Sequence, residues 1–246
     1  MAKTDEAPYV GRELELFALA TNWKRYVKAQ IQEYLAGDVL EIGAGIGGTT
    51  LAIHEGSVRR WICLEPDANL AKQLRTAVRN RGVYAPDVIA GSLRALADRP
   101  SFDCVLYLDV LEHIQDDRTQ IAEAERLVRP GGHIVILSPA HQWLFSEFDK
   151  SIGHIRRYDK RSLRSLAPRG WIEKKLAYLD SVGVLLSLAN ALALRQAMPT
   201  RLQISLWDRL CVPLSRIVDC ALLGNFGKSI LAIWENPTLK DPTTVG

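Results

Sequence analysis

The sequence predicts an α/β fold in which helices cover both faces of a mostly parallel β-sheet. From residue 38 onward, short apolar runs alternate with amphipathic segments, as the crossovers of a parallel sheet require. The central runs are apolar without alternation, as expected of strands buried on both faces. With 246 residues, of which 48% are hydrophobic, the chain is long enough for one large domain.

Helical segments flank and interrupt the predicted sheet. Apolar residues at helical spacing predict N-terminal helices within residues 11–36. Seven runs are predicted to be strands, at residues 38–44, 59–67, 87–93, 102–110, 131–140, 171–180 and 229–237. A long apolar connection, about 182–226, predicts an inserted helical element before the last strand. We therefore expect residues 1–246 to form a single domain that includes both helical additions.

The composition argues against several classes of partner. A net charge of +3 lacks the strongly basic balance of nucleic-acid-binding proteins, so no nucleic acid is expected. No apolar stretch reaches the roughly 20 residues of a membrane-spanning helix. The four cysteines form no C-x-x-C pair and the N-terminus has no apolar signal segment, which favours the cytoplasm.

The stretch "VLEIGAGIGGTT" follows the pattern G-x-G-x-x-G with Gly43, Gly45 and Gly48. The pattern predicts a tight turn and a helix N-terminus that suits a pyrophosphate or a carboxylate, but it does not choose between them. Glu41 precedes the glycines, where a carboxylate would repel phosphates and attract an amino group. Glu65 ends the next predicted strand, where it is expected to accept hydrogen bonds from ribose hydroxyls.

This combination resembles the S-adenosylmethionine site of class I methyltransferases, and the resemblance extends from Val39 to about Tyr158 through "VLEIGAGIGG", "LEPD", "GSL", "LYLDVLEHI" and "LVRPGGHIVILSP". It implies a Rossmann-like seven-stranded sheet of order 3-2-1-4-5-7-6 and S-adenosylmethionine as cofactor. Many relatives have an acid where this chain has Ser92, so the backbone amide of Leu93 is expected to contact the adenine. The implied cofactor contacts are Glu41, Gly43, Ala44, Gly45, Gly47, Glu65, Pro66, Ser92, Leu93, Asp109 and Val110.

The acceptor is expected between the loops that follow the fourth and fifth strands, because ligands of open parallel sheets bind beyond the carboxyl ends of the strands. His113, His141 and His154 are candidates for the base that removes a proton from the acceptor. A basic run in "HIRRYDKRSLRS" suggests a clamp for an acidic group on the acceptor, most directly through Arg157 and Tyr158. The predicted catalytic residues are His113, His154, Arg157 and Tyr158.

The turn D-x-x-E-H brings Asp109, Glu112 and His113 together, with His154 arriving from a later loop. A similar set of carboxylates and histidines binds a divalent metal in small-RNA 2′-O-methyltransferases. The same turn also occurs in members of the family that use no metal. We therefore expect no metal.

The sequence thus predicts a cytoplasmic S-adenosylmethionine-dependent methyltransferase that acts on an O or N atom of a small molecule. Wide apolar faces in residues 182–226 favour an acceptor with an apolar body, and the arginines favour an acidic group on it. The same helices are candidates for a homodimer interface. Two alternatives stay open: an NAD(P)-dependent oxidoreductase, supported by the literal glycine pattern, and a non-catalytic S-adenosylmethionine-binding module.

Overall fold

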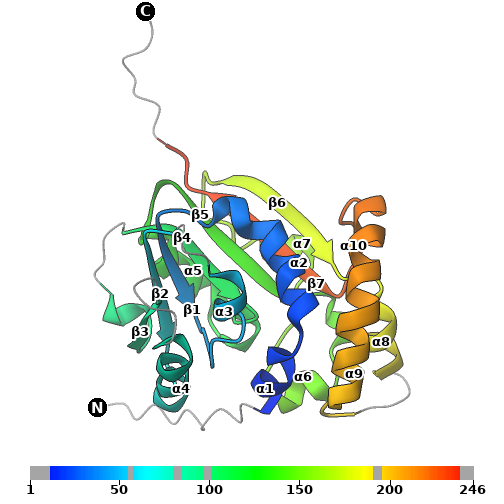
Figure 1. Ribbon diagram of the computed structural model, residues 1–246. Helices are drawn as coiled ribbons and strands as arrows, with labels where there is room; N and C mark the ends of the chain where they lie inside the picture. The colour runs from blue at the N-terminus through cyan, green and yellow to red at the C-terminus, as the bar shows by residue number, and fades with distance from the viewer. Residues whose placement is uncertain (1–11, 55–57, 80–84, 97–100, 191–195, 239–246) are drawn as a thin grey trace, which may run out of the picture.

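The structure of the protein, a computed structural model, describes residues 12–54, 58–79, 85–96, 101–190 and 196–238 (Figure 1). Its strands are β1 (Asp38–Ile42), β2 (Arg60–Glu65), β3 (Asp87–Ala90), β4 (Phe102–Leu108), β5 (Val128–Pro139), β6 (Ile172–Leu179) and β7 (Ser229–Glu235). Its α-helices are α1 (Arg12–Ala18), α2 (Thr21–Ile31), α3 (Thr50–Ile53), α4 (Ala68–Val78), α5 (Asp117–Glu125), α6 (Glu147–Ser151), α7 (Lys160–Arg164), α8 (Gly183–Ala189), α9 (Arg201–Leu206) and α10 (Val212–Ala221).

The seven strands form one sheet in the order β3-β2-β1-β4-β5-β7-β6. The pairs among β3, β2, β1, β4 and β5 are parallel, whereas β7 runs antiparallel to both β5 and β6. The predicted α/β class and strand order are therefore confirmed. Because β7 is reversed, its first residue, Ser229, pairs with Pro139 at the end of β5. The start of β7 consequently lies at the same edge of the sheet as the carboxyl ends of the parallel strands.

Two hydrophobic cores lie on opposite faces of the sheet. One core joins the sheet to α2, α3, α4 and the helices after β6, with Val27, Leu74 and Trp207 among its members. The other joins the sheet to α5 and α7 through Ile121 and Leu163. Successive strand residues contribute to alternate cores, because side chains of a strand point to opposite faces. Burial on both sides explains why the central runs are apolar throughout.

The helices after β6 stand at one side of the molecule, next to α2 (Figure 1). The segment from Arg201 to Ala221 is continuous, since a π-helical turn, η7 (Trp207–Cys211), joins α9 to α10. Pro213 lies just after this turn and has no N–H to donate, which explains the local change in hydrogen bonding. The helices α1 and α2 lie within residues 11–36, and α8 to α10 lie within 182–226. The assignment of residues 1–246 to a single domain stays a prediction.

Among the described residues, no helix combines the length and the apolar character needed to cross a bilayer. All four cysteines are free, and Cys63 and Cys104 are buried in the sheet.

Candidate active site

The glycine loop leaves β1 in a conformation that only glycine adopts readily. Gly43, Gly45 and Gly47 have φ angles of 66°, 56° and 82°. A Cβ atom on Gly43 would lie 2.7 Å from Cγ2 of Val110, so the loop approaches the segment after β4 too closely for a side chain. The helix that follows, α3, has only four residues, which is too short for the expected anion site at a helix N-terminus. We therefore expect the glycine loop, and not the N-terminus of α3, to contact a ligand.

A cavity of about 250 Å³ adjoins the glycine loop. Its lining includes the ends of β1, β4 and β5, the start of β7, and parts of α1 and α6. The glycine loop forms one part of this wall and the segment after α6 another. A ligand held by the loop would therefore meet side chains from distant parts of the chain.

Glu65 ties the glycine loop to the end of β2. Its Oε2 atom accepts a hydrogen bond of 2.8 Å from the backbone N–H of Gly45, and its Oε1 atom accepts one of 3.0 Å from Asp67. Burial raises the pKa of Glu65 above its ordinary value, although these two bonds oppose the shift. The carboxylate is thus fixed beside the loop, at the strand end where the sequence predicted it.

Glu41 lies on β1 and faces the cavity from inside the sheet. It is buried, and its Oε2 atom accepts a hydrogen bond of 2.9 Å from Nε1 of Trp61. Burial raises the pKa of Glu41 to about 7, although hydrogen bonds to its charged form oppose the shift. An ammonium group in the cavity would stabilise the ionised form, because it would supply the opposite charge that the site lacks.

The turn after β4 places His113 in the cavity wall. Asp109 begins this turn with a φ of 57°, and its N–H donates to the carbonyl oxygen of Leu137 over 2.8 Å. The ring of His113 meets that of His154 nearly edge to face, with 4.6 Å between the ring centroids. Burial, and then the neighbouring His154, lower the pKa of His113 to about 4. His113 is therefore neutral at physiological pH.

Asp149 of α6 holds the segment that follows it. The side chain is fully buried, and its oxygens accept bonds of 2.9 Å from both Nε and Nη2 of Arg157. Nδ1 of His154 lies 3.0 Å from Oδ1 of the same carboxylate. Burial alone would raise the pKa of Asp149, but the bonds from His154 and Arg157 hold it well below its ordinary value. The geometry is that of an acid that orients an imidazole.

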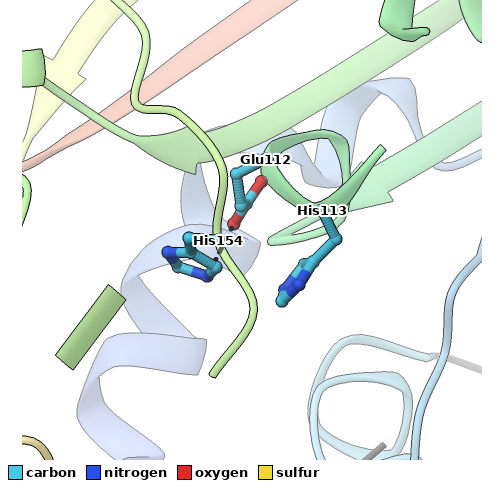
Figure 2. A group of neighbouring side chains, drawn as sticks. All are labelled: Glu112, His113 and His154. Carbon is cyan, nitrogen blue, oxygen red and sulfur yellow. Dashed lines mark ion pairs between the residues drawn. The ribbon is translucent and has the colours of Figure 1, made fainter. Parts of the chain in front are cut away.

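Figure 2 shows Glu112 and His113 projecting from the turn after β4 toward His154, which comes from the segment between α6 and α7. Among the residues described, these three offer ligand atoms that all lie within 4.8 Å of one another. Oε2 of Glu112 accepts a hydrogen bond from Ser138, whereas Oε1 is buried without a hydrogen bond and lies 3.7 Å from Nε2 of His154. One carboxylate and two imidazoles are the donor set of some zinc sites, so this group could hold a cation.

Comparison with known proteins shows which kind of domain the central part of the chain resembles. Residues 40–136 match a family model described as a methyltransferase domain. This part of the chain is thus similar to a methyltransferase domain. Norajmaline N-methyltransferase of Rauvolfia serpentina is 31% identical over 107 residues, which cover 43% of this chain and 37% of that protein. A ubiquinone/menaquinone biosynthesis C-methyltransferase of Burkholderia mallei is 25% identical, covering 49% of this chain and 51% of that protein. The chain spans about half or less of the length of these curated relatives.

Solved structures show the same fold over most of the chain. A putative methyltransferase in complex with the Haloferax volcanii Trm112 activator superposes with a TM-score of 0.64 at 14% identity, covering 93% of this chain and 95% of that one. The [4+2]-cyclase SpnF superposes with a TM-score of 0.61 at 15% identity, covering 93% and 96%. The family match supports S-adenosylmethionine as the cofactor, and one similar fold, N-methyltransferase NodS of Bradyrhizobium japonicum, is known with S-adenosylhomocysteine.

The structure gathers part of the predicted cofactor site around the cavity beside the glycine loop. Five of the predicted contacts line the cavity, namely Glu41, Gly43, Ala44, Gly45 and Asp109. Glu65 joins this group through its bond to Gly45. The others, Gly47, Pro66, Ser92, Leu93 and Val110, lie outside the lining. Apart from Gly47, which completes the glycine turn, they follow the ends of β2, β3 and β4. Their contacts with the cofactor stay predictions.

The predicted catalytic residues separate into two groups. His113, His154 and Arg157 line the cavity. Tyr158 does not, since its hydroxyl lies within the fold, 2.8 Å from Oδ2 of Asp117 and 3.2 Å from the carbonyl oxygen of Leu111. These bonds give Tyr158 a supporting role for the turn that carries His113.

His141, the third histidine considered as a base, also lies outside the cavity lining. Its ring stacks on that of Tyr178, with 4.5 Å between the ring centroids. His141 therefore serves as a matched control for His113 and His154, the two histidines that line the cavity.

The charged residues of the cavity that sequence reasoning missed include Asp149 and Lys228. Asp149 lies in the short helix α6, and the sequence around it shows no catalytic motif. Lys228 precedes β7, and its Nζ atom lies 3.5 Å from Oδ2 of Asp180 and 3.8 Å from the ring centroid of Trp207. Burial lowers the pKa of Lys228, and Asp180 opposes the shift. The reversed direction of the last strand was the one signal that could have placed Lys228 at the site.

Replacing Glu65 by alanine is expected to weaken binding of S-adenosylmethionine by about 1–3 kcal/mol, because ribose hydroxyls would lose charge-assisted hydrogen bonds. Isothermal titration calorimetry measures the change. Asp67→Ala is the matched control, since Asp67 lies two residues away and caps α4 through the N–H groups of Asn69 and Leu70. Equal affinities of the Glu65→Ala variant and the unaltered protein would remove Glu65 from the cofactor site.

The affinity for S-adenosylmethionine is expected to fall as the pH is lowered from 7 to 5.5. Burial raises the pKa of Glu41 to about 7, so acidification protonates the carboxylate that would pair with the amino group of the cofactor. The loss approaches about tenfold per pH unit if only the ionised form binds. Titrations across this range test it, with Glu41→Gln as the variant that cannot ionise. A pH dependence of the same slope in Glu41→Gln would assign it to another group.

Proposed function

We propose that this protein is an enzyme that transfers the methyl group of S-adenosylmethionine to an O or N atom of a small-molecule acceptor. The observation that carries the proposal is a shared cavity: Glu41 and the glycine loop form one part of its wall, and the Asp149–His154 pair forms another. A cofactor site and a proton-accepting pair thus meet in one space. The finer assignments below rest on this arrangement.

The residues at the carboxyl edge of the sheet fit the groups of S-adenosylmethionine. Glu41 suits its ammonium group, and the amides of the glycine loop suit its carboxylate. Glu65 suits the ribose hydroxyls, while Ser92 and the amide of Leu93 lie in the loop that would reach the adenine edge. When bound, the cofactor supplies an electrophilic methyl group on a positively charged sulfur.

The protein's contribution to transfer is to position the acceptor and to take its proton. The hydrogen bond to Asp149 assigns the proton of His154 to Nδ1, which leaves Nε2 as the accepting atom. As Nε2 takes up a proton, the Asp149 carboxylate stabilises the imidazolium. His113 stays neutral and packs against this ring, which fixes its orientation. His154 is therefore the better base of the two.

The cavity lining describes the acceptor. Phe17, Phe148, Ile152 and Trp207 contribute apolar surface, which suits an acceptor with an apolar body. Lys228, whose side chain is 21% exposed, contributes a cation that would suit an acidic group. Arg157, the clamp predicted from the sequence, already binds Asp149 through two nitrogens, so we assign it to positioning that acid.

We infer that the carboxyl group of Glu112 is protonated and that Glu112, His113 and His154 hold no metal cation. Burial raises the pKa of Glu112 well above its ordinary value, and Asp109 adds to the shift. Ser138 already donates to the other oxygen of the same carboxyl group. Methyl transfer is therefore expected to be unchanged by chelators. Loss of activity on chelation, with recovery in Mn²⁺ or Zn²⁺, would show that these side chains bind a cation.

His154→Ala is expected to lower turnover about a hundredfold while changing the affinity for S-adenosylmethionine by less than about twofold, because it removes the base but not the cofactor site. Formation of S-adenosylhomocysteine is measured with an acceptor found by screening amines, phenols and carboxylic acids with apolar bodies. His141→Ala is the control, since His141 lies outside the cavity lining. Equal turnover of both variants would place the base elsewhere.

Two alternative functions are tested by measuring ligand binding and turnover together. Trp23 and Trp207 line the cavity, so tryptophan fluorescence reports on ligands that enter it. Quenching by S-adenosylmethionine but not by NADH supports the proposal over an oxidoreductase. The likeness to SpnF, a [4+2]-cyclase, keeps binding without methyl transfer as the second alternative. Binding with no S-adenosylhomocysteine formed across the acceptor screen would favour that alternative.

We place the enzyme in the cytoplasm, because its four cysteines are all free. The low net charge of +3 supports a small-molecule acceptor over a nucleic acid.

A further inference from the structure

The helical segment from Arg201 to Ala221 has two faces of different chemistry. Its inner face enters the core through Ile204, Trp207 and Val212. Its two acids, Asp208 and Asp219, are also buried on this face. The outer face has no contact of this kind, so the segment covers the sheet with one side only.

The two buried acids fix how the segment is rotated about its axis. Asp208 accepts hydrogen bonds of 3.1 and 2.9 Å from the backbone N–H groups of Asn22 and Trp23, at the start of α2. Asp219 accepts bonds from the N–H groups of Asp180 and Ser181, and from the hydroxyl of Tyr26. Turning the outer face inward would break these bonds and bury uncompensated donors. The outer face therefore stays outside.

Large apolar side chains cover that outer face. Those exposed at intervals of three or four residues are Leu202, Leu206, Leu210, Leu214 and Ile217, with exposed fractions of 79%, 48%, 61%, 51% and 71%. This spacing puts them in one row along the helix. Ten of the fourteen exposed large apolar residues in the described chain lie between Leu185 and Phe226. Such a concentration marks an interaction surface.

The charged side chains that this segment exposes are all positive. Arg201, Arg209 and Arg216 are exposed, with the guanidinium of Arg216 also 5.9 Å from the ring centroid of Tyr26, whereas the only acids between residues 201 and 226 are the buried Asp208 and Asp219. The face thus combines a row of leucines and an isoleucine with arginines and offers no exposed carboxylate. A second copy of the same face would bring like charges together, which disfavours a symmetric dimer through it. A partner with an apolar interior and a negative surface fits both features.

We propose that this face docks on an anionic phospholipid membrane, with the segment from Arg201 to Ala221 lying in the plane of the interface. Its leucines would enter the boundary between headgroups and acyl chains, and its arginines would reach lipid phosphates. Figure 1 shows α8, α9 and α10 together at one side of the molecule. The same helices reach the cavity through Ser187 and Trp207.

Vesicle co-sedimentation of the full chain tests the proposal. Binding is expected to vesicles of phosphatidylcholine with 30% phosphatidylglycerol, and to be far weaker to phosphatidylcholine alone. The combined variant Arg201→Gln, Arg209→Gln and Arg216→Gln should bind about a hundredfold less, at about fivefold for each arginine. Added salt should weaken vesicle binding of the unaltered protein more than vesicle binding of this variant. Equal binding of the unaltered protein to both vesicle types would overturn the anionic docking.

The leucine row is tested by a second variant, Leu206→Ser with Leu210→Ser and Ile217→Ser, which should lose vesicle binding. The matched control is Leu19→Ser with Ile172→Ser, because those side chains are also exposed, at 52% and 47%, but lie outside this segment. Equal binding by both sets would refute the docking face. A protein that sediments as a dimer, becomes a monomer only in the Leu206→Ser, Leu210→Ser and Ile217→Ser variant, and ignores both vesicles would show that a second copy covers this face.

Discussion

Asp149→Ala is expected to lower the free energy of unfolding by about 3–5 kcal/mol, the cost of leaving one partner of a buried ion pair alone. Arg157 donates to Asp149 through both Nε and Nη2, and only 8% of the Arg157 side chain is exposed. The N–H and hydroxyl groups of Ser146 also donate to this carboxylate. Urea denaturation at pH 7 measures the change.

The control for this effect is Asp116→Ala. Asp116 also accepts a backbone hydrogen bond, 3.0 Å from the N–H of Thr119, but it caps α5 at the surface. Its loss should cost about 0.5–2 kcal/mol. The contribution of Asp149 is present above the ordinary pKa of an aspartate and is lost as the pH falls through its lowered pKa. Equal costs for the two variants would mean that burial of the Asp149 network adds nothing to stability.

Gly45→Val is expected to weaken binding of S-adenosylmethionine by about a hundredfold, because a branched side chain would occupy the cavity wall that faces the cofactor. A Cβ atom there would meet only the end of the Leu14 side chain, with Cδ1 at 3.3 Å and Cδ2 at 3.6 Å, and this side chain can move aside. The fold should therefore survive, as circular dichroism would show.

Gly170→Val separates the effect of the cavity from backbone strain. Gly170 has a φ of 79°, in the same left-handed region as Gly45, but a Cβ atom on it would meet nothing within 4 Å. Both variants carry the strain of a branched residue at positive φ, and only one reaches the cavity. If both variants bind S-adenosylmethionine with the affinity of the unaltered protein, the glycine loop does not hold the cofactor.

The sequence predicted the sheet well because each buried strand leaves a local signature. Runs such as "VLYL" are apolar on both faces, and turn residues mark their ends. The glycine loop was equally predictable, since the positive φ angles at Gly43, Gly45 and Gly47 favour glycine at these positions. Local conformation and local sequence agree in these elements.

The part of the cavity wall that we assign to the acceptor was less predictable, because its contacts join residues with no periodic relation. Five arginines or lysines cluster in "RRYDKRSLR", and nothing in their spacing indicates that Arg157 is the one that turns inward to Asp149. Tyr158 follows directly in the chain, yet its hydroxyl lies within the fold against Asp117. Lys228 is distant in sequence, and only the reversal of β7 brings it to the cavity.

The hydrogen bonds between Asp208 and the start of α2 limit the order in which parts of the chain can fold during synthesis. Asp208, whose carboxylate caps the start of α2, and Asn22, which donates its N–H to it, are 186 residues apart. At typical rates of about 5–20 residues per second, α2 waits about 10–40 s for this cap. The helices α1 and α2 also supply Phe17 and Trp23 to the cavity. A nascent chain that ends before α9 therefore leaves the cofactor pocket unfinished, however completely its first five strands have folded.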